Sequence, residues 1–188
     1  MKILCAEYNK AGETAIVPVG DDVLLRNNGD FYIPDFTQDV SCVPQFVVKI
    51  CKLGKAVSER FASRYYDEIG IGIRFYADSL ERTLETKGLP CIVASSFDSS
   101  AAISKMQKIG NRSLRYEMFV NEVSVFQSSM PELQVGIDRL IAMAGEMHTL
   151  KIGDYLYCGN AFRYRGIKAG DRIRVALEEE NVMQFAIR

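Results

Sequence analysis

A single histidine limits the chemistry that this chain of 188 residues can perform. His148 lies in the segment EMHTLKIGD, near the expected end of a helix. One histidine excludes a multi-histidine zinc site, and any Ser-His-Asp or Cys-His arrangement would depend on this residue alone. Its position favours a simpler role, in a last helical turn that faces the helix dipole or water.

The other reactive residue types form no recognisable site. The five cysteines are scattered and include no C-x-x-C pair, which predicts reduced structural thiols and a cytoplasmic protein. No glycine-rich phosphate loop occurs, and Gly70-x-Gly72 lies inside an apolar segment, where close packing explains it better than a nucleotide. The acidic pair Glu178-x-Glu180 has strand spacing but falls in an expected hairpin tip, where solvated charge is the better interpretation.

Charge and hydropathy exclude two classes of partner. The net charge is −1, so nothing predicts binding to nucleic acid, and the basic segment Arg163-Tyr164-Arg165 is expected to be a solvated turn. No apolar run approaches the length of a membrane span, and the one in MKILCAEYNK is too short for a signal peptide. We expect neither a nucleic-acid nor a membrane partner.

The elements that must position a site are mostly strands. An apolar strand over 68–76 passes at Ala77-Asp78-Ser79 into a helix over 79–87, and such a junction is a common place for a site. Further helical segments are predicted over 58–66 and 131–147, with a long strand over 45–53 and a hairpin-type turn over 26–30. Because short strands dominate without regular βαβ alternation, we predict one β-rich α+β domain over 1–188.

A series of short motifs extends along nearly the whole chain and includes Leu53-Gly54-Lys55, Arg64-Tyr65-Tyr66-Asp67, Gly72-Ile73, Gly88-Leu89-Pro90, Phe97-Asp98-Ser99-Ser100, Gly153-Asp154 and Gly170-Asp171. In this order the motifs resemble the fumarylacetoacetate hydrolase family, in its short single-domain branch. The resemblance implies the family's C-terminal domain fold, a roll of mixed β-sheets with about three helices, usually assembled as a homodimer. It also implies cleavage, isomerisation or decarboxylation of acidic β-dicarbonyl compounds such as acylpyruvates, with Mg²⁺ or Mn²⁺ stabilising the enolate.

Carried onto this chain, the family's metal-site positions depart from the family pattern. The Glu-x-Glu pair falls on Val43-Pro44-Gln45, and the metal-binding aspartate falls on Arg74. A lysine becomes Ser95, and the Thr-Gly-Thr loop reads Cys158-Gly159-Asn160. Asn9 keeps its place, whereas the family's His and Glu are missing with most of the lid between them. We therefore expect Val43, Gln45, Arg74, Ser95 and Asn160 to be remnants of a site, with no metal ligands and no cofactor.

Two hypotheses follow from these departures. A dication beside an arginine and one neutral amide meets repulsion, so the first hypothesis is a pseudoenzyme that binds a small acid or has a structural role. Arg74 would either bind a carboxylate ligand or fill the cavity through an internal ion pair, with Gln45 or Asp78 as acceptors. The alternative is a metal-independent hydrolase, isomerase or decarboxylase that uses Asp78, Glu81 or His148 as its base.

Overall fold

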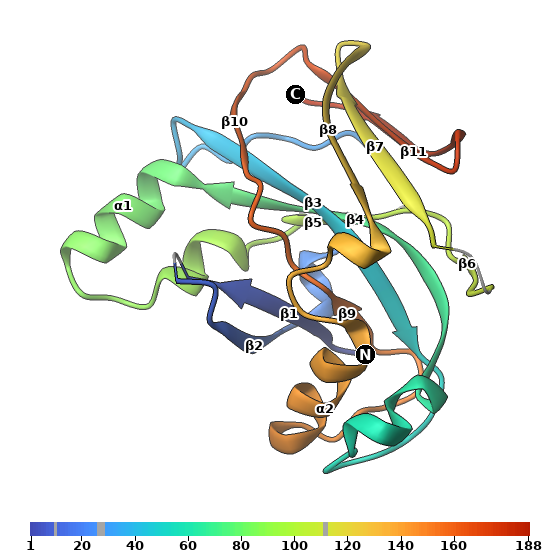
Figure 1. Cartoon of the computed structure of the whole chain (residues 1–188). Coiled ribbons are helices and arrows are strands. Elements are labelled where there is room, and N and C mark those ends of the chain that lie inside the picture. The colour runs from blue at the N-terminus through green and yellow to red at the C-terminus, as the bar shows by residue number, and fades with distance from the viewer. Residues whose placement is uncertain (10, 26–28, 111–112) are drawn as a thin grey trace.

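The computed structural model in Figure 1 describes residues 1–9, 11–25, 29–110 and 113–188 and consists mainly of two β-sheets. Within these ranges the larger sheet has eight strands. Six follow the order β2 (Thr14–Val19), β1 (Ile3–Tyr8), β9 (Tyr155–Tyr157), β3 (Val40–Ile50), β4 (Tyr66–Ala77) and β5 (Ala101–Ile103). The short strands β10 (Tyr164–Ile167) and β6 (Gln107–Lys108) pair with β3 and β4. Since β1 and β9 are parallel and the other pairs antiparallel, the sheet is mixed.

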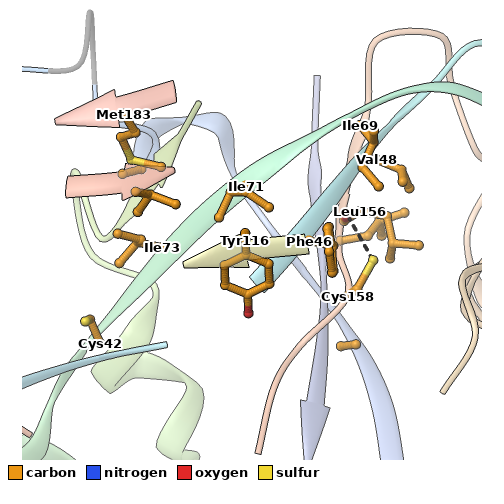
Figure 2. Close-up of a cluster of buried hydrophobic side chains, with 14 of the residues drawn as sticks. Cys42, Phe46, Val48, Ile69, Ile71, Ile73, Tyr116, Leu156, Cys158 and Met183 are labelled. Carbon is orange, nitrogen blue, oxygen red and sulfur yellow. Dashed lines mark hydrogen bonds between the residues drawn. The ribbon is translucent and has the colours of Figure 1, made fainter. Parts of the chain in front are cut away.

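The smaller sheet is antiparallel and covers one face of the larger one. Its strand order is β12 (Glu180–Ala186), β11 (Arg172–Leu177), β7 (Arg115–Val120) and β8 (Val123–Ser129). Figure 2 shows side chains from β3, β4 and β9 meeting Tyr116 of β7 and Met183 of β12 in a buried apolar cluster. Phe75 of β4 belongs to the same core and stacks on Phe31 with 3.8 Å between ring centroids. The predicted β-rich α+β fold is therefore confirmed.

The described residues contain two α-helices and four short 3₁₀ segments. Helix α1 (Asp78–Thr86) continues directly from β4, as the sequence predicts, and α2 (Ile137–Met147) lies near one end of the larger sheet (Figure 1). The predicted helix over 58–66 is a 3₁₀ segment, Glu59–Arg64. The other 3₁₀ segments are Asp21–Val23, Cys91–Ser95 and Met130–Glu132. None of the helices in the described part of the chain is long and apolar enough to cross a membrane.

The prediction that α2 begins at Pro131 is wrong. Pro131 belongs to the separate 3₁₀ turn Met130–Glu132, which is closed by a capping box between Ser129 and Glu132. The chain then becomes extended at Leu133, and the helix starts only after Gly136. A capping box marks a helical start, but here the apolar spacing that follows it is interrupted by one extended turn.

Strand β3 begins five residues earlier than the predicted strand over 45–53 and ends at Ile50. It runs through Pro44, which has no N–H group to donate to a neighbouring strand. Pro44 is tolerated because β10 pairs with Val40–Cys42 and β9 with Val47–Lys49, which leaves a gap beside Pro44. The predicted hairpin-type turn over 26–30 has residues 26–28 outside the described ranges.

Candidate functional site

The paired strands β3 and β4 have one apolar face and one face that carries the candidate site. Residues directly opposite each other in an antiparallel pair project to the same side. On one side, pairs such as Phe46 and Ile71 lie in the core between the sheets. On the other side, Val43 lies opposite Arg74 and Gln45 opposite Gly72, so the expected metal-site positions share one face.

A cavity of about 510 Å³ opens on this second face. Residues of β1, β3, β4, α1 and β10 line it, together with the loops that follow β1 and β9 and the segment before α2: Ala6, Glu7, Tyr8, Asn9, Gly12, Val43, Tyr76, Glu81, Gln134, Gly159, Asn160, Ala161, Arg163 and Arg165. The size is suitable for a small organic ligand. The cavity thus includes two of the five expected remnant positions, Val43 and Asn160, and one candidate base, Glu81.

Arg74 lies behind the cavity wall with its side chain fully buried. Its Nη2 donates a 2.6 Å hydrogen bond to the carbonyl oxygen of Ser95, and its Nη1 lies 3.5 Å from a carboxylate oxygen of Glu7. Nε and Nη1 make no hydrogen bond. Burial acts to lower the pKa of Arg74, but the neighbouring Cys5, Tyr76 and Glu7 keep it above the ordinary value. The guanidinium is therefore a permanent buried charge.

Neither of the acceptors expected for Arg74 contacts it in the structure. We predicted Gln45 or Asp78 as acceptors, but Gln45 Oε1 accepts a 2.6 Å hydrogen bond from the backbone N–H of Gly159. Asp78 is held by two other arginines. The structure instead joins two remnant positions directly, Arg74 and the backbone of Ser95.

Glu7 is the acidic neighbour that the sequence analysis did not single out. It lies near the end of β1 and lines the cavity, with 30% of its side chain exposed. The Tyr76 hydroxyl donates to its two carboxylate oxygens at 3.3 and 3.2 Å. Burial raises the pKa of Glu7, and this outweighs the lowering by Arg74, Tyr76 and Arg163. Glu7 is thus a half-buried carboxyl group that holds a proton more tightly than it would in water.

A cluster of Arg163, Asp78 and Glu81 lies beside the cavity on the side of α1. The prediction that the segment 163–165 is a solvated turn is wrong for Arg163. Arg163 is not a solvated turn residue, because only 19% of its side chain is exposed. Its guanidinium stacks over the Tyr76 ring at 4.2 Å and binds both carboxylate oxygens of Glu81, at 3.2 and 2.7 Å. It also pairs with Asp78, and its Nε donates to the Ser41 hydroxyl at 2.6 Å.

The more exposed Arg165 lies in β10 and contacts Asp78 at 3.1 Å. The arginines of this segment therefore join strand β10 and the chain before it to the start of α1. Net charge could not reveal this arrangement, because it says nothing about where charges meet.

The loop after β9 is shaped by its own hydrogen bonds. Asn160 donates through Nδ2 to the carbonyl of Pro44 at 3.2 Å and to the Tyr116 hydroxyl at 3.0 Å. Gly159 has φ +73°, and a Cβ at this position would lie 2.2 Å from the Tyr8 ring and 2.5 Å from the Ala6 carbonyl oxygen. Only glycine fits this close approach. The polar groups of Gln45 and Asn160 are thus already used in building the cavity wall.

The three candidate bases have different positions in the structure. Asp78 is buried and Glu81 partly buried, and both are ion-paired with Arg163. His148 caps the C-terminal end of α2, as expected, and lines a different cavity with Lys2 and Asp154. The structure does not bring His148 to the cavity beside β3 and β4.

The donors at the expected metal positions do not fit Mg²⁺ or Mn²⁺. These cations require several converging oxygen ligands, usually with carboxylates among them. Val43 has no donor, the amide oxygen of Gln45 is engaged, and Arg74 brings a positive charge. Over the described ranges, no three His, Cys, Asp or Glu side chains converge as metal ligands would.

Comparison with known proteins agrees with this architecture. No family model matches the chain. The chain is 25% identical over 179 residues to the mouse mitochondrial oxaloacetate tautomerase FAHD1, covering 93% of this chain and 77% of that protein. The rat protein of the same name is 24% identical over 178 residues, with the same coverage.

Two solved structures share the fold over the whole chain. A fumarylpyruvate hydrolase from Pseudomonas aeruginosa, in complex with Mn²⁺ and pyruvate, superimposes with a TM-score of 0.88 at 14% identity and is covered to 89%. A protein assigned to the fumarylacetoacetate hydrolase family, from Yersinia pestis CO92, gives a TM-score of 0.88 at 22% identity and is covered to 92%.

The fold and cavity define a mixed β-sheet protein with a polar pocket on one face of its central strand pair. The sequence similarity to the tautomerases, together with the fold shared with these two structures, supports the resemblance to the fumarylacetoacetate hydrolase family that the sequence motifs indicate.

Proposed function

We propose that this chain has lost the divalent-metal site of its family and acts as a pseudoenzyme, which keeps the cavity as a binding site for a small carboxylic acid. The observation that carries the proposal is the buried Arg74, opposite Val43 on the site face. Its guanidinium is compensated from within the protein, by Glu7 and the Ser95 carbonyl. A buried positive charge there opposes a dication and takes the place of one.

The role of Arg74 itself follows from its burial. The two interpretations of this residue were a ligand-binding group and an internal ion pair that fills the cavity. Because the guanidinium is 0% exposed, the geometry supports the internal ion pair. Arg165 is the better candidate for meeting an acid from solvent, since it lines the cavity and 62% of its side chain is exposed. An arginine side chain can bind a carboxylate through two parallel hydrogen bonds.

A metal-independent enzyme acting on acidic β-dicarbonyl compounds is the second candidate function. The observation that favours it is Glu7, a cavity carboxyl group with a raised pKa next to the Tyr76 hydroxyl. A raised pKa suits a group that exchanges protons near neutral pH. Asp78 and Glu81 are poorer candidates because Arg163 holds both of them. A homodimer in the cytoplasm is the assembly and location that we propose, from the family resemblance and the free thiols respectively.

Binding of Mn²⁺ and turnover, measured together, test the proposal. Titration of Mn²⁺ with the protein, followed by electron paramagnetic resonance, is expected to leave the signal of the free ion unchanged. Acetopyruvate and oxaloacetate should not be turned over, with the mouse tautomerase as a positive control for oxaloacetate. Binding of Mn²⁺ or turnover abolished by EDTA would overturn the proposal, whereas turnover that survives EDTA would establish the second candidate function.

A further inference from the structure

We infer that Glu7 is a ligand-binding residue of the cavity and that a small carboxylic acid binds there together with one proton, shared between its carboxyl group and that of Glu7. The inference rests on the proposed function, because it requires that the cavity bind a small acid. It adds the residue that recognises the acid and the proton that accompanies it.

The first support is the position of Glu7. The carboxyl group lines the same cavity as Arg163 and Arg165, and part of its surface is open to that space. Tyr76 donates to it from one side, and Arg74 approaches it without a hydrogen bond. One side of the carboxyl group therefore remains free to meet a ligand.

The second support is the charge balance around the cavity. Among the described residues, the charged groups that line the cavity or form an ion pair with a charged lining residue are three arginines and three carboxylates: Arg74, Arg163, Arg165, Glu7, Asp78 and Glu81. They sum to zero when all are ionised. An incoming carboxylate then adds an uncompensated negative charge next to Glu7. If Glu7 takes up a proton, the wall has one net positive charge, which the ligand neutralises.

The third support is the chemistry of two neighbouring carboxyl groups. Two like charges at close range disfavour each other, so one of the pair binds a proton. The protonated oxygen of Glu7 then donates a charge-assisted hydrogen bond to the ligand carboxylate. The proton comes from solvent, and no other covalent bond is made or broken.

Some of the groups that face Glu7 raise its pKa, and others lower it. Cys5 lies on the same strand, and burial raises the pKa of its thiol to about 11, so it stays neutral near pH 7. Arg74 and Tyr76 of β4 and Arg163 before β10 favour the ionised form of Glu7, whereas burial and Glu81 of α1 favour the protonated form. In balance, these groups raise the pKa of Glu7 before the ligand arrives, and a ligand carboxylate raises it further.

Isothermal titration calorimetry with pyruvate and malonate, in EDTA and in buffers of different ionisation enthalpy, tests the inference. The difference in heat between buffers gives the number of protons taken up per ligand. We expect this number to rise towards one as the pH increases above the pKa that Glu7 has in the ligand-free protein. The affinity should then fall about tenfold for each further pH unit, as one linked proton requires.

Two variants at the site and one matched control identify the group that is protonated. Glu7→Gln is expected to bind without proton uptake and with an affinity that does not depend on pH. Tyr76→Phe removes a hydrogen bond to ionised Glu7, so the pH dependence should begin at higher pH. Glu85→Gln, at an exposed position on α1, should behave like the unchanged protein. The wild-type measurement stands even if Glu7→Gln fails to fold.

The outcomes separate the inference from the proposed function. Binding of either acid without proton uptake overturns the inference and leaves small-acid binding intact. Undiminished proton uptake in folded Glu7→Gln also overturns it, because the proton would then bind elsewhere. If neither acid binds the wild-type protein at any pH, small-acid binding fails and the inference fails with it.

Discussion

The two faces of the β3–β4 pair differ in what holds them together. Toward the smaller sheet, apolar side chains pack in a continuous core, where Phe75 stacks on Phe31 and Ile71 is fully buried. Toward the cavity, the same strands carry Arg74 and Gln45. Arg74 forms an ion pair with Glu7 of β1 and donates a hydrogen bond to the segment 91–95, and Gln45 accepts a hydrogen bond from the loop after β9. The core face depends on shape and volume. On the site face, the surroundings of Arg74 depend on charge, whereas Gly72 and Val47 pack against Tyr157.

The difference also explains how such a site can change while the fold stays. Directly adjacent residues in a strand project to opposite sides, so Arg74 lies between two core residues, Ile73 and Phe75, without touching the core that they form. We therefore expect a substitution on one face to leave the packing of the other face unchanged. The predictions below test this separation, from the largest expected effect to the smallest.

Replacement of Phe75 by alanine should have the largest effect. It removes a buried ring that stacks on Phe31 and meets Phe185 edge-on. We expect a loss of about 4 kcal/mol in the free energy of unfolding, measured with urea, and the same loss at pH 5 and pH 8. Phe36→Ala, at an exposed ring, is the control and should cost less than about 1 kcal/mol. A loss at Phe75 that changes with pH would contradict the separation of the two faces.

Replacement of Arg74 by methionine should cost about 3 kcal/mol at neutral pH, because it leaves Glu7 without its cationic partner. This loss should depend on pH. The pKa of Glu7 is raised in the folded protein and rises further without Arg74, so the folded variant holds a proton that the unfolded chain releases above about pH 4.5. The free energy of unfolding of the variant therefore falls as the pH rises, and its loss relative to wild type is greater at pH 8 than at pH 5.

The double variant Arg74→Met with Glu7→Gln provides the control for this effect. It removes both charges, so most of the lost stability should return and the pH dependence should disappear. Equal losses at pH 5 and pH 8 in the single variant would show that Arg74 contributes volume rather than charge.

Replacement of Gly72 by alanine should have the smallest effect of the three. It places a methyl group on the site face, 2.3 Å from a ring carbon of Tyr157 and 2.6 Å from a methyl group of Val47. We expect a loss of about 2 kcal/mol from overpacking, independent of pH. Gly136→Ala, with no neighbour within 4 Å, is the matched control and should change stability by about 0.5 kcal/mol or less. No loss at Gly72 would mean that Tyr157 can move aside.

The main elements of the fold could be predicted from the sequence because their signals are local. The apolar run that ends at Ala77 and the polar residues Asp78 and Ser79 mark the end of β4 and the start of α1. Local sequence signals did not predict the start of β3, because it depends on which strands pair with β3. Pro44 argues against a central strand, and only the gap between β9 and β10 allows it to lie in β3.

The site was predictable only in part. The absence of a carboxylate at Val43 and the charge at Arg74 are visible in the sequence, and the structure places both residues on one face. Glu7 and Arg163 were missed because no local pattern marks them, since each belongs to a segment far along the chain from β4. The available signal was the polar group Glu7-Tyr8-Asn9 at the end of a buried first strand.

The ion pair between Arg74 and Glu7 also limits how this protein could change during evolution. A single change of Arg74 to aspartate would place two carboxyl groups next to each other behind the cavity wall, with no cation between them. A carboxylate introduced at Val43 alone would face the Arg74 guanidinium rather than a dication, and a change at Gln45 would break the hydrogen bond from Gly159. A site with carboxylates at the three expected metal positions therefore requires changes at Val43, Gln45 and Arg74 together.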